Sequence, residues 1–263
     1  NAGGQTGSTG IRDSIVLNDR RTSTTDQNFT VANTVSWARF TGFESISAGT
    51  PWDDNISLSF SNDMGSADVG LNDATGITLI DLTADTGNAG TNTIDLSLED
   101  DTSVGYTVKG SANIDVLSGG AGVDTLEGNG GGDTLTGGGG GDIITGGAGN
   151  DVAVYNAEND LFASGAYNSS TGAGTLVDTI SLGEENDTNG DPTDADEIRI
   201  VGSSAFTIDA DNDFGTIGAE KITAGNSAEN LTIHLHAGAW DDGIKTIDLT
   251  GDGTNGNDTN TIN

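Results

Sequence analysis

The sequence predicts an all-β protein of many short strands, arranged as a solenoid, a sandwich or a roll. Three observations predict this. Most apolar segments are short, rich in β-branched residues and alternate with polar ones. A glycine-rich block repeats every nine residues. Only 5% of residues are aromatic and 2 are Pro. Such a chain cannot build a thick core, but it can build a thin one from ladders of Ile, Leu and Val.

The predicted strands are four to six residues long and lie between turns of Gly, Asn and Asp. Pro51 and Pro192 both lie in loop-like surroundings. The strand segments are Ser14–Leu17, Asn55–Phe60, Thr78–Leu82, Thr93–Leu98, Tyr106–Val108, Glu197–Val201, Leu231–Leu235 and Thr246–Leu249.

Charge limits the classes of partner. The chain carries 41 acidic and 8 basic residues, a formal net charge of −33. Phosphate binding needs a basic surface, so this balance argues against nucleic acid and against anionic membranes. No apolar run approaches the ~20 residues of a membrane helix, so we expect no membrane insertion. Divalent cations would relieve the repulsion between the acids, which favours calcium over the alternative of a merely soluble or halophilic surface.

The chain has no Cys, so a secreted form must be stapled by something other than disulfides, such as a metal. It begins at Asn1 without a signal-peptide pattern. We therefore expect it to be a mature or excised segment of a secreted or cell-surface protein.

The glycine-rich block spans residues 110–154. From Gly110 it reads GSANIDVLS, GGAGVDTLE, GNGGGDTLT, GGGGGDIIT and GGAGNDVAV, and it holds 16 of the 42 glycines. Each unit carries Asp at its sixth position and an apolar residue two places later. These are Asp115, Asp124, Asp133, Asp142 and Asp151, followed by Leu117, Leu126, Leu135, Ile144 and Ala153. A plain glycine-rich linker has no reason to keep this spacing.

The block lies inside a longer, diverged duplication. This divides the chain into a β-rich module at 1–109, the block at 110–154 and a second β-rich module at 155–263. The duplication also suggests that the parent protein is longer and built of tandem units. The alternative is a single duplication within a self-contained protein. The matching segments are Ile11–Leu17 with Leu176–Leu182, Gly42–Gly49 with Gly218–Gly225, Asn55–Phe60 with Asn230–Leu235, Ile80–Asp85 with Ile247–Asp252, and Thr91–Asp95 with Thr259–Asn263.

The chemistry of one unit predicts a cation site. In Gly119–Glu127 the first six residues form a turn and the last three a short strand. Glycines allow positive φ, which turns several carbonyl oxygens towards one point, and Asp124 adds a carboxylate. Calcium prefers six to eight oxygens. One turn cannot supply that number, whereas two stacked turns can.

These units resemble the RTX family of haemolysin-type calcium-binding repeats, whose pattern is G-G-x-G-x-D-x-U-x. The resemblance implies a parallel β-roll, with Ca²⁺ bound between turns one coil apart. One turn would give the carbonyls of its first and third residues, the turn one coil further on those of its second and fourth, and each turn its Asp. Carried over, this implies three sites: Gly110, Ala112 and Asp115 with Asn129, Gly131 and Asp133; Gly119, Ala121 and Asp124 with Gly138, Gly140 and Asp142; and Gly128, Gly130 and Asp133 with Gly147, Gly149 and Asp151.

Some positions depart from the pattern. Asn113 replaces the fourth-position glycine of the first turn, and Ser111 and Asn129 stand at second positions. Ala153 replaces a large apolar residue, which fits an end of the roll. The flanking segments GAEKITAGNSAENLTIHLHAG and IKTIDLTGDG are similar to bacterial surface-layer and RTX adhesin-like proteins.

Other candidate sites have simpler interpretations. His234 and His236 could bind zinc, but Ser59 and Ser61 stand at the matching positions. Neighbouring acids could form the acid pair of a glycosidase, but close carboxylates are expected by chance among 41 acidic residues. These neighbours are Asp53–Asp54, Asp241–Asp242 and Glu184–Asp187. Asp209–Asp213 begins like an EF-hand loop without its later ligands. Trp52 and Trp240 fit loop anchors better than sugar-stacking residues.

The sequence therefore predicts a non-enzymatic, extracellular calcium-binding structural protein. It would fold in calcium after type I secretion and assemble with copies of itself into a surface layer, fibre or matrix. Surface polysaccharide is a further candidate partner. The alternatives are a segment of an RTX adhesin and the non-catalytic part of a secreted RTX hydrolase.

Overall fold

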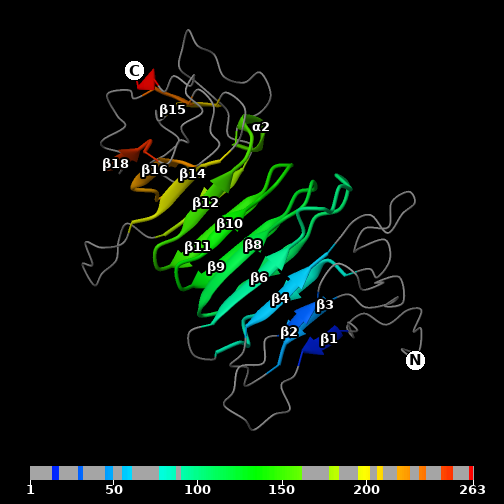
Figure 1. Ribbon diagram of the computed structural model, residues 1–263. Helices are drawn as coiled ribbons and strands as arrows, with labels where there is room; N and C mark the ends of the chain where they lie inside the picture. Colours follow the sequence, from blue (N-terminus) through cyan, green and yellow to red (C-terminus); the bar gives the residue numbers. More distant parts are fainter. Residues whose placement is uncertain are drawn as a thin grey trace.

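Nineteen short strands and one helical turn make up the described part of the computed structural model (Figure 1). That part comprises residues 14–17, 29–31, 45–49, 55–60, 77–86, 90–161, 178–183, 195–201, 206–209, 218–225, 231–234, 244–250 and 261–262. The strands are β1 (Ser14–Leu17), β2 (Phe29–Val31), β3 (Ser45–Ala48), β4 (Ile56–Ser59), β5 (Leu79–Asp81), β6 (Thr91–Asp95), β7 (Thr107–Lys109), β8 (Ile114–Ser118), β9 (Thr125–Gly130), β10 (Thr134–Thr136), β11 (Ile143–Ala148), β12 (Val152–Tyr155), β13 (Thr179–Ser181), β14 (Glu197–Ile200), β15 (Phe206–Asp209), β16 (Lys221–Ala224), β17 (Leu231–His234), β18 (Thr246–Asp248) and β19 (Thr261–Ile262). The helical turn is α2 (Glu158–Leu161). No helix of the described residues is long and apolar enough to cross a membrane.

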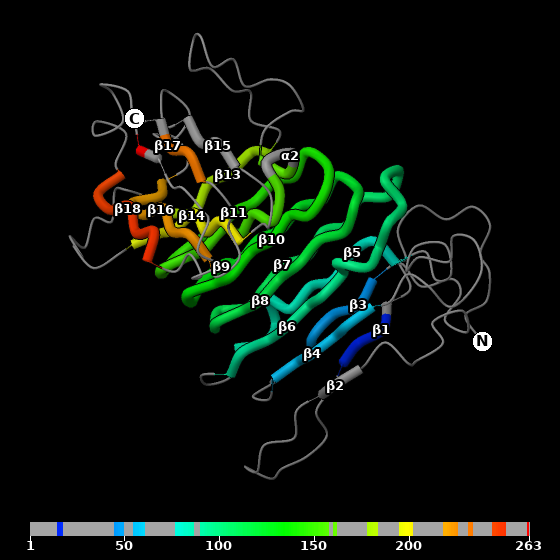
Figure 2. The backbone as a smooth tube through the Cα atoms, turned by 45° about the horizontal axis from the view of Figure 1, so that its top comes forward, coloured from blue at the N-terminus to red at the C-terminus, as the bar shows by residue number. Residues whose placement is uncertain are grey.

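The strands alternate between two long parallel sheets. The odd sheet runs β1-β3-β5-β7-β9-β11-β13, and the even sheet runs β18-β16-β14-β12-β10-β8-β6-β4-β2. Every strand pair is parallel and joins coils of a single solenoid (Figure 2). The predicted all-β parallel roll is therefore confirmed, and each of the eight segments predicted as strands overlaps one.

A continuous file of aliphatic side chains runs along the inner face of each long sheet and forms the centre of the core. Alternation along each strand points every second residue inward, and the parallel register stacks it on its counterpart one coil away. On the odd sheet the file is Ile46, Ile80, Val108, Leu126, Ile144 and Ile180, all at most 5% exposed. On the even sheet it is Leu58, Ile94, Leu117, Leu135, Ala153, Ile198 and Ile222, all at most 1% exposed.

Coil length separates the glycine-rich block from its flanks. Within the block, paired residues lie 18 positions apart, as in Leu117 with Leu135. Beyond it the same pairing spans insertions, so that Ile144 pairs with Ile180 and Ala153 with Ile198. Both long sheets continue across the two predicted boundaries, between residues 109 and 110 and between residues 154 and 155. The three predicted domains remain a prediction, but the strands on both sides of the block belong to the same sheets.

The strand order can be compared with the predicted duplication, which remains a prediction. A third sheet, β15-β17-β19, alternates with β14, β16 and β18 just as the even strands alternate with the odd ones in β1–β6. Four of the five predicted matches fit this order: β3 with β16, β4 with β17, β5 with β18 and β6 with β19. The remaining match pairs Ile11–Leu17, which contains β1, with Leu176–Leu182, which contains β13. The order of sheets instead makes β14 the counterpart of β1, since β15 then corresponds to β2.

Candidate metal centre

The five nonapeptide turns lie along two opposite edges of the solenoid. The first, third and fifth turns lead from the odd sheet to the even sheet, and the second and fourth lead back. Turns 18 residues apart are therefore stacked directly on one another. The structure brings together the same turns that the sequence pairs: first with third, second with fourth, and third with fifth.

Each stack is joined by a ladder of hydrogen bonds through its aspartates. The N–H of Asp115 donates to Oδ1 of Asp133, and the N–H of Asp133 donates to Oδ1 of Asp151, both at 2.8 Å. On the opposite edge the N–H of Asp124 donates to Oδ1 of Asp142, also at 2.8 Å. All five aspartates are at most 1% exposed. One carboxylate oxygen of the later aspartate thus fixes the register of the coils.

The backbone of the later turns has the geometry that the predicted carbonyl ligands require. Positive φ occurs at the second and fourth positions of the third, fourth and fifth turns, the six residues assigned to the second half of each site. They are Asn129 (75°), Gly131 (113°), Gly138 (97°), Gly140 (121°), Gly147 (114°) and Gly149 (120°). Residues 110–124, which the structure describes throughout, include no positive φ. Alternating positive φ reverses successive peptide planes.

Close contact between coils explains why glycine fills these positions. A Cβ atom on Gly140 would lie 2.3 Å from the carbonyl oxygen of Gly122, and one on Gly149 would lie 1.7 Å from that of Gly131. Asn129 tolerates its left-handed conformation better than most residues, and its side-chain amide donates to the carbonyl of Gly110 at 3.0 Å.

The second carboxylate oxygen, Oδ2, accepts a hydrogen bond in the first two turns but not in the third and fourth. Oδ2 of Asp115 accepts the N–H of Ser111 at 2.6 Å, and Oδ2 of Asp124 accepts that of Gly120 at 2.7 Å. The corresponding Oδ2 atoms of Asp133 and Asp142 are buried and accept no hydrogen bond. A buried carboxylate oxygen without a donor is costly unless a cation is nearby.

Burial also changes the acidity of these groups. It raises the pKa of Asp133 and of Asp142 from 3.8 to about 7, and neighbouring carboxylates add to the effect. Burial raises the pKa of Asp115 and Asp124 as well, although hydrogen bonds oppose it. Repulsion between the aspartates and the missing donors both favour a bound cation.

The arrangement fits calcium rather than a metal held by side chains alone. Among the described residues, no group of three or more His, Cys, Asp or Glu side chains could hold a metal ion. Each stacked pair of turns offers two carboxylates and four carbonyls, and calcium accepts six or more such oxygens. The predicted ligand residues all lie in these turns, and their assignment to individual ions remains a prediction.

The ladder continues past the block, which sequence reasoning missed. The N–H of Asp142 donates to Oδ1 of Asp178 at 2.8 Å, and the N–H of Asp151 donates to Oδ1 of Asp196 at 2.6 Å. Asp178 also accepts the buried hydroxyl of Tyr155 at 3.2 Å, and burial raises the pKa of this carboxyl to about 6. Both aspartates stand two residues before an inward-facing isoleucine, which is the signal that could have identified them.

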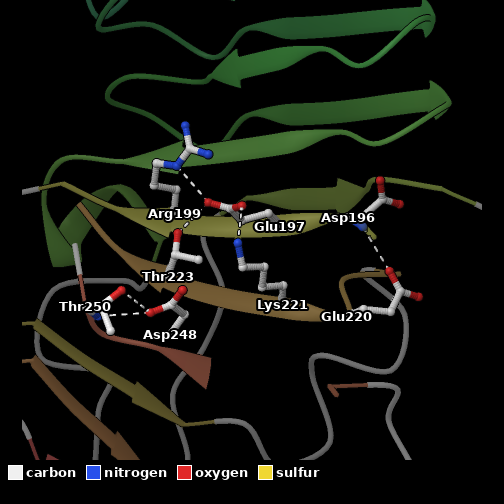
Figure 3. A network of polar contacts seen from close by, with 8 residues as sticks. All are labelled: Asp196, Glu197, Arg199, Glu220, Lys221, Thr223, Asp248 and Thr250. Carbon is white, nitrogen blue, oxygen red and sulfur yellow. Dashed lines mark hydrogen bonds and ion pairs between the residues drawn. The ribbon is translucent and has the colours of Figure 1, made fainter. Parts of the chain in front are cut away.

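A polar network follows at the C-terminal end of the even sheet (Figure 3). The N–H of Asp196 donates to Oε2 of Glu220 at 2.9 Å, which extends the ladder by another step. On the outer face Glu197 pairs with Arg199 at 2.7 Å and with Lys221 at 3.3 Å. Burial opposes ionisation of Glu197, but these partners and the hydroxyl of Thr223 lower its pKa. Here basic side chains, rather than a metal, balance a buried acid.

The remaining candidate sites lie wholly or partly outside the described residues. His234 ends β17, but His236 is not described. Asp209 ends β15, and the rest of Asp209–Asp213 is not described. The acid pairs and both tryptophans also lie outside this part: Asp53–Asp54, Asp241–Asp242, Glu184–Asp187, Trp52 and Trp240.

Comparison with known families gives one match. The model of the RTX calcium-binding nonapeptide repeat (4 copies) matches residues 107–135 and 127–162. No curated protein and no solved structure matches the chain. The block is therefore a set of RTX repeats, as the sequence predicts. RTX repeats bind Ca²⁺, which makes calcium the metal of the stacked turns.

Proposed function

We propose that this chain is part of a secreted, non-enzymatic structural protein that folds when calcium binds outside the cell. It would then assemble with copies of itself into a surface layer, fibre or matrix. The observation that carries the calcium-dependent step is the pair of buried Oδ2 atoms on Asp133 and Asp142, which accept no hydrogen bond. In a cytosol poor in calcium these carboxylates oppose folding, and outside the cell calcium neutralises them.

Assembly is supported by the form of the solenoid. Its parallel sheets end on β1 and β13 and on β2 and β18, strands that pair on one side only within the described part of the chain. Strands of this kind can pair with another chain. The acidic composition favours contacts that form only when calcium is present. Binding of a surface polysaccharide stays a prediction, because the tryptophans that suggest it are outside the described residues.

The test combines circular dichroism and electron microscopy on the same protein, with EGTA and with calcium. We expect β signal to appear as calcium is added, followed by ordered assemblies. No gain of β signal would contradict calcium-dependent folding. A calcium-folded protein that stays monodisperse would contradict assembly alone, and would favour a segment of an adhesin or of a secreted hydrolase.

A further inference from the structure

The coil before the nonapeptide block places Asn92 where later coils place aspartate. Asn92 pairs in register with Asp115, the first aspartate of the block. Its Oδ1 accepts the N–H of Ile56 at 2.9 Å, just as Oδ1 of Asp133 accepts the N–H of Asp115 at 2.8 Å. The carbonyl half of the Asn92 side chain therefore does what a ladder aspartate does.

The amide half of Asn92 points at the oxygens that a cation would attract. Its Nδ2 lies 2.8 Å from Oδ1 of Asp115, 3.0 Å from Oδ2 of Asp85 and 3.2 Å from Oγ of Ser111, so its two hydrogens are shared among three acceptors. All four residues are at most 3% exposed. An amide nitrogen carries only donors, so it can stand between two carboxylates that would otherwise repel each other.

The carboxylate of the first turn is held by protein donors on both of its oxygens, whereas Oδ2 of Asp133 and of Asp142 has none. Besides Asn92, the N–H of Ser111 donates to Oδ2 of Asp115 at 2.6 Å and its hydroxyl donates at 3.1 Å. One coil further on, Oδ2 of Asp133 has no donor. Oδ2 accepts a hydrogen bond in the first and second turns, which contain no positive φ. It accepts none in the third and fourth turns, where two residues of each turn have positive φ.

We propose that the Asn92 amide takes the place of a metal ion at the N-terminal end of the carboxylate ladder. Asn92 is thereby a positioning residue for the first calcium site: it holds Asp115 on one side, and calcium binds on the other. The inference rests on the proposed calcium-dependent folding. It explains why the ladder can extend through the coil before the block although that coil lacks a nonapeptide turn.

Two substitutions of Asn92 separate this role from simple packing. Asn92→Asp keeps the shape but exchanges the donor for a third carboxylate beside Asp85 and Asp115. We expect this variant to lose β structure at calcium concentrations that fold the wild type, to recover it at higher calcium, and to bind one more ion per chain. Asn92→Leu offers no ligand. We expect it to need about tenfold more calcium to fold, because it loses hydrogen bonds to charged groups, and to bind no extra ion.

Calorimetric calcium titration and circular dichroism provide the measurements, and Asn156→Asp is the matched control. Asn156 is exposed, so this variant adds the same charge on a side chain in contact with solvent and should behave as the wild type. An Asn92→Asp protein with wild-type stoichiometry and midpoint would overturn the inference, as would one that no calcium concentration can fold. In both cases wild-type calcium binding would leave the proposed function intact. A wild type that binds no calcium would overturn both.

Discussion

Asp133 lies in the middle of the stack formed by the first, third and fifth turns. Its Oδ1 accepts the N–H of Asp115, its own N–H donates to Asp151, and its Oδ2 is buried without a hydrogen bond. It belongs to two of the three predicted sites, whereas Asp142 belongs to one. The roles of these two aspartates can therefore be distinguished by counting ions.

We expect Asp133→Asn to lose two calcium ions per chain and Asp142→Asn to lose one. The reason is that an amide supplies one weaker oxygen ligand in place of a carboxylate. Calorimetric titration of each variant against the wild type measures the stoichiometry. Equal losses for the two variants would contradict the shared role of Asp133.

The raised pKa values of Asp133 and Asp142, about 7, predict opposite effects of pH with and without calcium. Without calcium, the folded state binds more protons than the unfolded state. The stabilisation by these groups is therefore complete below their unfolded pKa and is lost as pH rises through 7. Calcium needs the deprotonated form, so its apparent affinity should increase with pH.

We expect the calcium concentration at the folding midpoint to be several-fold higher at pH 6 than at pH 8. Circular dichroism across a calcium series at each pH measures this midpoint. In Asp142→Asn the dependence should be weaker, because one titrating group is gone. A midpoint that does not change with pH would exclude proton competition at these carboxylates.

At the scale of the strand, the thin core depends on single inward-facing side chains. Leu135 on β10 lies in the even-sheet file between Leu117 and Ala153 and is 0% exposed. Because this file is one side chain wide, a missing side chain leaves a gap that neighbours in the same coil cannot fill. The next residue in the file, Ala153, is itself small.

We therefore expect Leu135→Ala to lower the free energy of unfolding in saturating calcium by about 2–5 kcal/mol. Thr134→Ala, on the outer face of the same strand, should cost less than about 1 kcal/mol. Urea denaturation of both variants measures the difference. Similar losses for the two would show that the core file does not carry the stability of the roll.

The whole molecule carries a formal charge of −33. Three calcium ions would neutralise about six of these charges, so general screening and specific binding can be separated. NaCl at 1 M shortens the electrostatic screening length to about 3 Å, but it supplies no divalent ion for the predicted sites. Magnesium prefers octahedral sites and dehydrates reluctantly.

We expect neither 1 M NaCl nor millimolar magnesium to replace calcium in forming β structure. Both should lower the calcium concentration needed only modestly. Circular dichroism with each salt after EGTA treatment makes the comparison. Full folding in NaCl alone would indicate that repulsion, rather than the stacked turns, controls the transition.

The sequence by itself determined the turns, the inward-facing residues and the metal. A nine-residue period with Asp at one position and an aliphatic residue two places later leaves few arrangements of strand and turn, and stacking 18 residues apart follows from it. These features are local, because each nonapeptide contains the whole of its own turn and strand. The structure stacks the same turns that the sequence pairs, whereas the ligand residues of each ion remain a prediction.

Only the tertiary structure decided how far the solenoid extends. Asn92 and Asp196 extend the ladder on one edge, and Asp178 extends the ladder on the opposite edge, across insertions that break the nine-residue spacing. Their positions are therefore fixed by pairing between coils. The same pairing carries both sheets through the edges of the block and makes β14, not β13, the counterpart of β1. A repeat is visible in sequence only while its spacing is constant, whereas hydrogen bonds between parallel strands keep their register whatever loop lies between them.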